Sequence, residues 1–255
     1  MNGCSLSSAG RAMDCYSMCR RFKTCSGRRT QVYLSPFFYV QIVFEIWEFK
    51  MNDIKLQKKD FRKKVKEVVT KFCKDELLCK ECEKSAFQTF TASDVYKQAD
   101  VIFCYMAMWD EISVSKIIEQ AIKDNKKVAL PKIDNDNSIM DFYFVDSLNN
   151  VEPEKNYGIL EPNSACEKVI LSQLKGNVVI LVPGRAFNLH GERIGRGKGF
   201  YDKFLSQLSE YKNSFNLKVC GVSYSVQITK DFPVEETDYK MEYLLCEYGI
   251  TKVHA

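Results

Sequence analysis

The chain has 255 residues, of which 45% are hydrophobic and 27% charged, and its formal net charge is +4. These values are those of a soluble globular protein with one domain or at most two. Residues 1–50 hold 7 Lys and Arg residues and 3 Asp and Glu residues, which leaves 30 of each sign in residues 51–255. A neutral body argues against a general nucleic-acid surface.

Eleven cysteines are present, but the number is odd, the chain is long, and we find no secretory signal with a clean apolar segment. We therefore expect mostly reduced thiols in an intracellular protein. Cys79 and Cys82 have the spacing of zinc ligands. Neither a second Cys pair nor a His pair follows at a suitable distance, so a structural zinc site is the less favoured interpretation.

Residues 1–50 differ from the rest of the chain. Residues 1–31 contain six basic residues, five serines and one acidic residue, which is typical of an organelle transit peptide. Residues 33–49 are apolar and aromatic but are interrupted by a proline and two glutamates, so no membrane span is predicted. We expect residues 1–50 to be a non-core extension, either a targeting segment or absent from a protein that starts at Met51. Residues 51–255 then form a single domain.

Hydrophobic periodicity predicts helices that alternate with strands. Predicted helices cover residues 55–73, one or two short segments within 75–98 capped near Ser93 and Asp94, residues 113–123, and a segment beginning at Gly199. Predicted strands cover residues 101–107, 127–133, 141–145, 178–182, 217–224 and about 243–246. This alternation predicts a three-layer α/β/α fold with a mainly parallel sheet.

The strongest chemical signal lies in residues 178–205. An apolar strand ends at Pro183-Gly184, and a loop follows in which glycines alternate with Arg and Lys, most densely from Gly195 to Gly199. The loop leads into a helix N-terminus, which is a favourable site for an anion. Glycine lets the backbone approach an oxyanion closely, and the basic side chains add charged donors. The pattern predicts phosphate binding, with a solvated basic turn as the open alternative; it matches neither a Walker loop nor the dinucleotide fingerprint.

The stretch from Pro183 to Asp202 resembles the signature of the 5-formyltetrahydrofolate cyclo-ligase family, also called methenyltetrahydrofolate synthetase. The matching residues are Pro183, Gly184, Ala186, Phe187 and the run from Gly191 to Asp202. The resemblance implies a NagB/RpiA-like α/β/α fold. It also implies an enzyme that uses ATP and Mg²⁺ to convert 5-formyltetrahydrofolate to 5,10-methenyltetrahydrofolate through a phosphorylated formyl intermediate, giving ADP and phosphate.

The resemblance also implies roles for individual residues. The expected catalytic residues are Lys198 and Arg196. The expected ATP-binding residues are Lys58, Arg62, Arg193, Ile194, Gly195, Arg196, Gly197, Lys198, Gly199, Phe200 and Tyr201. The folate pocket is expected to include Met106, Glu111, Arg196, Gly197, Lys198, Gly199 and Phe200, and Mg²⁺ is expected at Asp202 and Asp238. Taken alone, Lys58 and Arg62 would belong to a solvated helix face, and the carboxylates to caps or turns.

Two positions depart from the family pattern. Phe200 stands where the family usually has the first of two tyrosines, and Arg185 replaces a residue that is normally apolar. They leave open an ATP-dependent enzyme of the same fold that acts on a different amide or acid. A non-catalytic module that binds a polyanion through the basic glycine loop is a third and less favoured alternative. We expect a monomer with small-molecule substrates and neither nucleic-acid nor membrane partners. The expected compartment is the cytoplasm, or a mitochondrion or other organelle if residues 1–50 are a transit peptide.

Overall fold

The computed structural model describes residues 54–154, 159–235 and 238–253. They belong to one compact unit, Asn52–Ala255. The predicted extension of residues 1–50 and the possible start at Met51 lie outside the described residues. No helix in the described part of the chain is long and apolar enough to cross a membrane.

The helices lie close to where the hydrophobic periodicity predicts them. Ser93 caps the short helix that follows it, because its hydroxyl accepts a hydrogen bond from the backbone N–H of Tyr96 at 3.2 Å. The helices are α3 (Ile54–Phe72), α4 (Glu76–Ala92), α5 (Asp94–Lys97), α6 (Ser115–Lys123) and α7 (Phe200–Glu210), with short 3₁₀ helices η1 (Leu148–Asn150), η2 (Leu171–Gln173) and η3 (Ser225–Gln227).

A seven-stranded sheet in the order β12-β11-β9-β6-β1-β2-β3 forms the centre of the unit. Its inner neighbours are parallel, and only the edge strands β12 and β3 pair antiparallel. The strands are β1 (Val101–Phe103), β2 (Lys127–Asp134), β3 (Ile139–Val145), β6 (Asn177–Pro183), β9 (Asn216–Val222), β11 (Tyr243–Cys246) and β12 (Gly249–Lys252). The prediction of a mainly parallel sheet is confirmed.

Some strand predictions were wrong in extent. The strand predicted for residues 101–107 ends at Phe103, and the one predicted for 217–224 ends at Val222. Strand β12 was not predicted. Neither were the short strands of two smaller sheets, β4 (Val151–Pro153) with β5 (Leu160–Pro162), and β7 (Ala186–Asn188) with β8 (Arg193–Ile194) and β10 (Ile228–Thr229).

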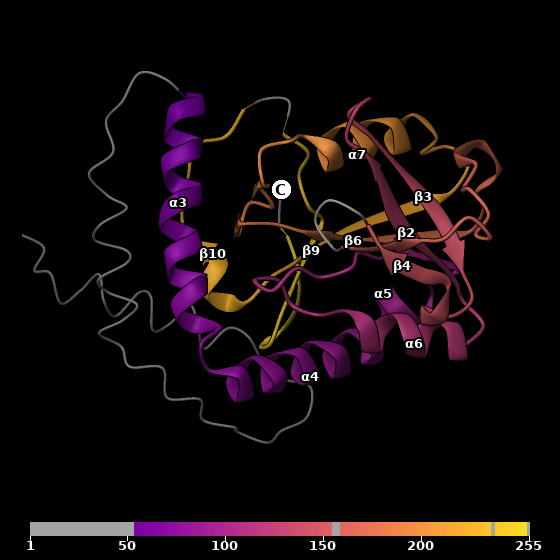
Figure 1. Cartoon of the computed structure of the whole chain (residues 1–255), viewed down its shortest axis with the longest axis horizontal. Coiled ribbons are helices and arrows are strands. Elements are labelled where there is room, and N and C mark those ends of the chain that lie inside the picture. Colours follow the sequence, from indigo (N-terminus) through magenta and orange to yellow (C-terminus); the bar gives the residue numbers. More distant parts are fainter. Residues whose placement is uncertain (1–53, 155–158, 236–237, 254–255) are drawn as a thin grey trace, which may run out of the picture. The chain divides into compact units, whose positions relative to one another are not determined.

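Helix α7 covers one face of the large sheet, and α4, α5 and α6 lie along the other (Figure 1). Under α7, the rings of Phe103, Phe142 and Phe204 pack with centroids 4.5 to 5.8 Å apart. Side chains alternate across a strand, so Ile102 points to the opposite face, where α6 supplies buried isoleucines. This burial on both faces explains why the inner strands read as continuous apolar runs.

The sheet order determines which loops meet. Strands β1 and β6 are parallel neighbours, so the loops that leave their carboxyl ends, residues 104–114 and 184–199, emerge at the same edge. Strand β9 pairs with the other side of β6, and η3 follows it at that edge. The glycine-rich loop therefore lies between a segment that contains Asp110 and Glu111 and a segment that contains Gln227.

Candidate active site

The glycines at the end of the basic loop have backbone conformations that few other residues adopt. Gly197 has φ = 100° and Gly199 has φ = 71°, and Gly199 occupies the N-cap position of α7. A side chain at Gly195 would meet Arg193, because its Cβ would lie 2.6 Å from Nη1 of that guanidinium. The alternation of Gly with Arg and Lys thus has a local structural cause.

Arg193 is buried and packed rather than open to solvent. Its Nη2 donates to Oδ1 of Asp202 at 2.6 Å, and its guanidinium lies 5.7 Å from the ring centre of Tyr201. Its Nε is buried without a hydrogen-bond partner among the described residues. Arg193, which was predicted to bind ATP, therefore forms an ion pair with Asp202, which was predicted to bind Mg²⁺.

Helix α3 places two predicted phosphate-binding residues against the same loop. Lys58 is only 4% exposed, and its Nζ binds Oδ2 of Asp238 at 2.5 Å and Oε2 of Glu235 at 2.8 Å. Arg62 donates from Nε to the carbonyl of Gly195 at 2.8 Å. Burial lowers the pKa of Arg62, and the nearby carboxylates Asp238, Glu235 and Asp202 offset only part of that effect. Arg62 is thus a partly buried cation bonded to the glycine-rich loop.

The two predicted magnesium carboxylates lie close enough to Arg62 for both to affect its pKa. In the described part of the chain, no group of three or more His, Cys, Asp or Glu side chains is arranged to hold a metal ion. Mg²⁺ commonly uses only one or two carboxylates together with phosphate oxygens and water. Asp202 accepts through Oδ1 and Asp238 through Oδ2, so each keeps a second oxygen that accepts no hydrogen bond from a described side chain. This donor set fits a nucleotide-bound Mg²⁺ better than a metal site made only of protein ligands.

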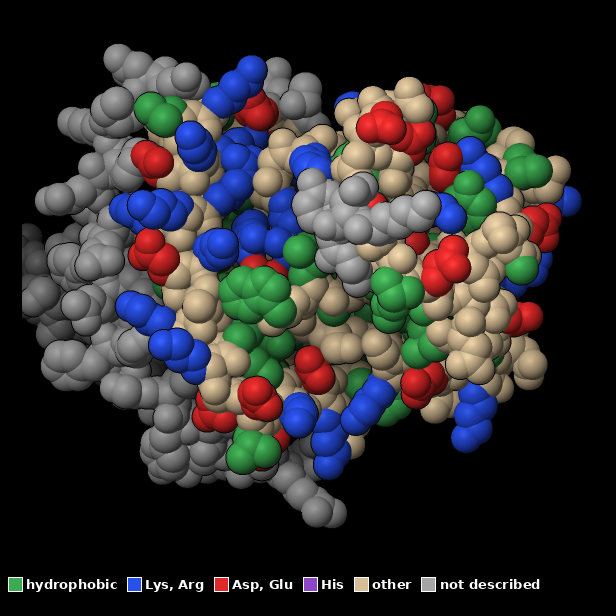
Figure 2. Space-filling model, in the orientation of Figure 1, with side chains coloured by type: hydrophobic (Ala, Val, Ile, Leu, Met, Phe, Trp, Pro, Cys, Tyr) green, Lys and Arg blue, Asp and Glu red, His purple; other side chains and the backbone are tan. Residues whose placement is uncertain are grey.

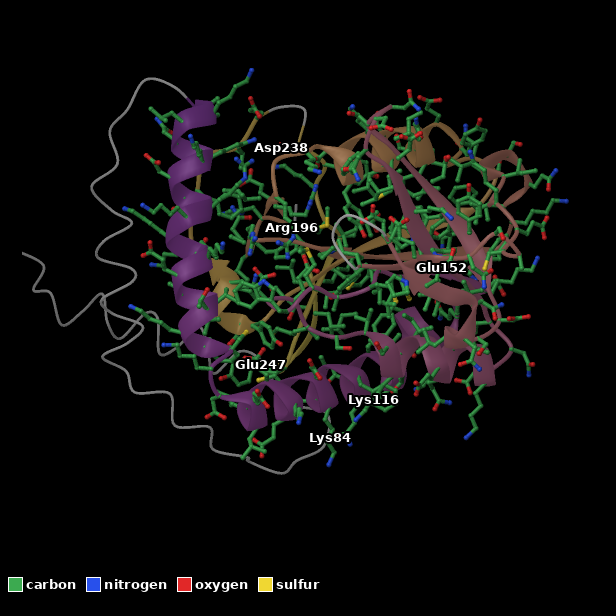
Figure 3. The ribbon with its side chains drawn as sticks, viewed as in Figure 1. Lys84, Lys116, Glu152, Arg196, Asp238 and Glu247 are labelled. Carbon is green, nitrogen blue, oxygen red and sulfur yellow. The ribbon has the colours of Figure 1, made fainter. Side chains whose placement is uncertain are left out.

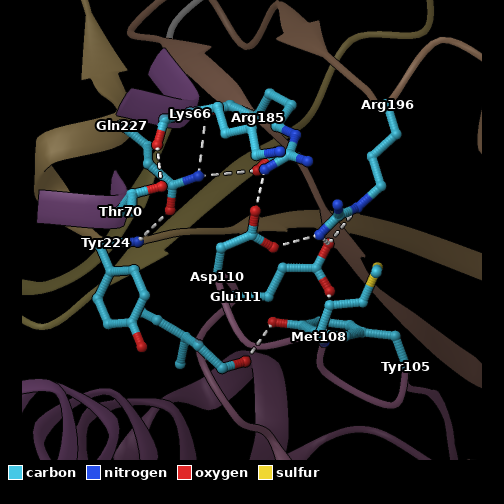
Figure 4. Close-up of polar contacts among 12 residues, drawn as sticks. Lys66, Thr70, Tyr105, Met108, Asp110, Glu111, Arg185, Arg196, Tyr224 and Gln227 are labelled. Carbon is cyan, nitrogen blue, oxygen red and sulfur yellow. Dashed lines mark hydrogen bonds and ion pairs between the residues drawn. The ribbon is translucent and has the colours of Figure 1, made fainter. Parts of the chain in front are cut away.

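Arg196 is held by two adjacent carboxylates in the loop that follows β1 (Figure 4). Its Nη2 contacts Oδ1 of Asp110 at 2.5 Å and Oε1 of Glu111 at 2.8 Å, and its Nε donates to the same Glu111 oxygen at 3.0 Å. The other Glu111 oxygen accepts from the backbone N–H of Met108 at 3.0 Å. Burial opposes the charge of Arg196, but Glu111 and Asp110 raise its pKa above the ordinary value.

The remaining predicted residues have surroundings of their own. Lys198 donates to Oδ1 of Asn135 at 2.9 Å and lies 5.8 Å from the ring centre of Phe200. Asn135 lines a polar hollow of about 440 Å³ on the β2–β3 hairpin. Met106 is half-buried just after β1, and Ile194 is buried in β8. Lys and Arg side chains gather between α3 and the central part of the face in Figure 2, and Figure 3 labels Arg196 and Asp238 in that region.

Residues 54–247 match the family model described as the 5-formyltetrahydrofolate cyclo-ligase family. The chain belongs to this family. The resemblance that the glycine-rich signature carries is thereby confirmed.

Curated members of the family cover most of the described chain. A probable 5-formyltetrahydrofolate cyclo-ligase of Caenorhabditis elegans is 26% identical over 199 residues, which are 77% of this chain and 96% of the relative. The 5-formyltetrahydrofolate cyclo-ligase of Escherichia coli K12 is 30% identical over 55% of this chain and 74% of its own. The 5,10-methenyltetrahydrofolate synthetase structure from Aquifex aeolicus matches with a TM-score of 0.62 at 24% identity, covering 78% of this chain and 93% of its own, and it supports the fold.

Two site residues were not predicted in their observed roles. Asp110 was not among the predicted site residues, yet its side chain is fully buried between Arg196 and Arg185. Gln227, which is 1% exposed, was not considered at all, and its Nε2 donates to the carbonyls of Gly184 and Arg185. The unusual arginine at position 185 was the one available signal, because a charge beside a buried strand end needs a partner.

Proposed function

We propose that this protein converts 5-formyltetrahydrofolate and ATP to 5,10-methenyltetrahydrofolate, ADP and phosphate in a Mg²⁺-dependent reaction. One observation carries the proposal: in a chain of this family, Glu111 in the loop after β1 binds Arg196 in the glycine-rich loop that precedes α7. A carboxylate suited to the N–H donors of a pterin is thus placed beside a cation suited to phosphate. We assign the reaction to a single domain formed by residues 51–255.

The reaction needs activation of a formamide oxygen, which is a poor leaving group. The formyl oxygen takes the γ-phosphoryl group of ATP, and ADP leaves. The side-arm nitrogen then attacks the formyl carbon, a C–N bond closes the ring, the nitrogen loses its proton and phosphate departs with the oxygen. Catalysis of such steps consists mainly of positioning and charge neutralisation.

The basic side chains of the loop supply that neutralisation. Lys198 and Arg196 donate to the γ-phosphoryl oxygens and the developing charge on the formyl oxygen, while the N–H groups of residues 195–199 and Arg62 hold the other phosphates. Lys58 and Arg193 are already bonded to carboxylates, so they could bind phosphate only in addition to, or in place of, these carboxylates. We therefore assign them chiefly to holding Asp238 and Asp202.

Asp202 and Asp238 would hold the Mg²⁺ that accompanies ATP. When bound, the ion neutralises phosphate charge and orients the nucleotide. Glu111 accepts from the pterin, and Met106, Phe200 and Tyr201 form apolar walls of the folate pocket.

The test uses the full chain with ATP, Mg²⁺ and 5-formyltetrahydrofolate, and it follows the absorbance of the methenyl product. Lys198→Met should lower kcat by about 100-fold or more, the usual loss for a donor to transition-state charge, without unfolding the protein. Lys126→Met is the matched control, because Lys126 binds the carbonyls of Lys97 and Ala99 near the amino ends of β1 and β2. A wild-type protein that makes no product contradicts the proposal, and near-normal turnover in Lys198→Met removes that residue from the mechanism.

Residues 1–50 determine the compartment that we propose. A targeting role places the enzyme in an organelle, as the printed name of an Arabidopsis thaliana relative, a mitochondrial 5-formyltetrahydrofolate cyclo-ligase, illustrates for that protein. A start at Met51 places it in the cytoplasm. Imaging of a fluorescent fusion with and without residues 1–50 distinguishes the two, because only a targeting segment changes the location when it is removed.

A further inference from the structure

Asp110 is a buried carboxylate that receives two guanidinium groups. Its side chain has no exposed surface, its Oδ1 accepts from Arg196 and its Oδ2 accepts from Nη1 of Arg185. Figure 4 shows the two arginines reaching it from different sides. Burial alone would raise the pKa of Asp110, but the hydrogen bonds and charges of Arg196 and Arg185 outweigh it and hold the pKa below its ordinary value. Asp110 is therefore a fixed negative charge rather than a proton donor.

The backbone holds Arg185 in the orientation that this contact needs. The N–H of Arg185 donates to the carbonyl of Ile194 at 2.7 Å, and Nε2 of Gln227 donates to the carbonyls of Gly184 and Arg185 at 2.9 and 3.0 Å. Gln227 is itself fixed, because its Oε1 accepts from the N–H of Tyr224 at 3.0 Å. The turn after β6 is thus bonded on both sides, and the Arg185 side chain, only 14% exposed, is directed at Asp110.

The charges of the cluster cancel only because Arg185 is present. Asp110 and Glu111 contribute two negative charges, and Arg185 and Arg196 two positive charges. With an apolar residue at position 185, Arg196 would face two carboxylates alone, and the cluster would carry a net negative charge beside a site for polyphosphate. Such a field weakens the binding of an anion and of an oxyanion-like transition state.

We infer that Asp110 and Arg185 form a positioning pair for Arg196. Asp110 fixes Nη2 of Arg196, and Arg185 neutralises Asp110, so that Arg196 keeps its positive charge available to the substrate. Nη1 of Arg196 has no hydrogen-bond partner among the described residues and is the donor left for the ligand. The inference rests on the proposed function, in which Arg196 contacts the γ-phosphoryl group. It assigns Arg185, a departure from the family pattern, to charge balance rather than to a changed substrate.

The test compares Arg185→Met, Arg185→Lys and the double variant Asp110→Asn with Arg185→Met. Two readouts are measured for each: kcat for the methenyl product, and the dissociation constant of Mg²⁺-ATP by calorimetry. Removing only the positive charge should weaken ATP binding and lower kcat, each by about tenfold, which is less than the loss of a direct donor. Arg185→Lys keeps the charge and should stay within about threefold of the wild type.

The double variant separates a charge role from a merely structural one. Its cluster contains Glu111 and Arg196 alone and is neutral again, so ATP affinity and kcat should recover relative to Arg185→Met. Losses that add instead, or an Arg185→Met variant with reduced thermal stability but wild-type kcat and ATP affinity, overturn the inference. Lys126→Met reports any general effect of removing a cation. If Arg185→Met fails to fold, the double variant and Arg185→Lys still test the inference, because both must approach the wild type in kcat and in ATP affinity.

Failure of the proposed function gives a different result. A wild type that binds ATP but makes no methenyl product overturns the proposed reaction while the binding measurements still test the positioning pair. A wild type that does not bind ATP overturns both.

Discussion

Replacing Lys58 by methionine should lower the free energy of unfolding by about 2–3 kcal/mol, because it leaves two carboxylates without their shared cation. The Lys58 side chain is 6% exposed, and it binds Asp238 at 2.5 Å and Glu235 at 2.8 Å. The two partners lie 177 and 180 positions away in the chain, so this contact fastens α3 to the segment before β11. Methionine keeps most of the apolar length of lysine, and the substitution therefore changes charge more than packing.

The magnitude follows from two opposing terms. Unit charges about 3 Å apart attract by roughly 5 kcal/mol at an effective dielectric constant of about 20, and burial of the ammonium costs several kcal/mol in lost hydration. Removing one partner of a buried pair typically costs about 3–5 kcal/mol. Glu235 is 35% exposed, against 17% for Asp238, so water screens part of its charge and the expected loss lies at or below that range.

Urea and thermal unfolding at fixed ionic strength measure this loss. For a domain of this size, about 2–3 kcal/mol corresponds to a fall in Tm of roughly 4–12 °C. Lys63→Met is the matched control on an exposed position of the same helix, and it should change stability by no more than about 0.5 kcal/mol. Adding Asp238→Asn to Lys58→Met should recover part of the loss. A Lys58→Met variant as stable as the control, or a double variant with no recovery, would contradict a stabilising role for this ion pair.

Two further substitutions test the surroundings of the site. Gly221→Ala should cost about 1–3 kcal/mol in thermal or urea unfolding, because its Cβ would lie 2.4 Å from Cε1 of the fully buried Phe187; an unchanged Tm would contradict this packing. Burial raises the pKa of Glu247 despite the hydrogen bonds that Ser225 donates, so ionisation of Glu247 opposes folding. The wild type should therefore lose stability relative to Glu247→Gln as the pH rises from about 4, near the unfolded pKa, to about 7. Urea unfolding of both proteins across this range checks the sign, and a difference independent of pH would contradict it.

The elements predicted correctly are those whose signal is local. Helix α3 carries a full hydrophobic period, and strand β6 is a continuous apolar run. Helix α7 begins directly after Gly199, whose positive φ marks the N-cap. The short strands β7, β8 and β10 have two or three residues each, which is too few for a period to be visible. Residues 104–107 were assigned to a strand because they are mostly apolar. Apolar side chains indicate that a segment is buried, but they do not show that its backbone pairs with a neighbouring strand. Only Cys104 continues the ladder, through its N–H to the carbonyl of Ala129.

The site was predictable where the loop's own residues or the resemblance to the family pointed to it. The loop of Gly195 to Gly199 was found from its own residues, whereas Asp110 was missed because its partners lie 75 and 86 positions further along the chain. The same distance effect concealed the environment of Lys58, which helical periodicity alone places on a solvated face. Contacts of this kind depend on which strands become neighbours, and the sheet order was not readable from spacing.

A cation paired with a carboxylate recurs at three places in the site. Double variants that remove both charges of such a pair are informative because they leave the net charge unchanged. Lys58 binds Asp238, Arg193 binds Asp202, and Arg196 binds Asp110, and each pair joins chain segments that leave different elements. Each contact therefore fixes a segment and also cancels a charge. Removing the charge of one partner both frees the segment and leaves an unbalanced charge. Removing the charges of both partners frees the segment but keeps the net charge. The polyphosphate that we propose as a ligand would compete for these cations with carboxylates that already pair with them, so its affinity would depend on which cations keep an uncommitted donor, as Arg196 does through Nη1.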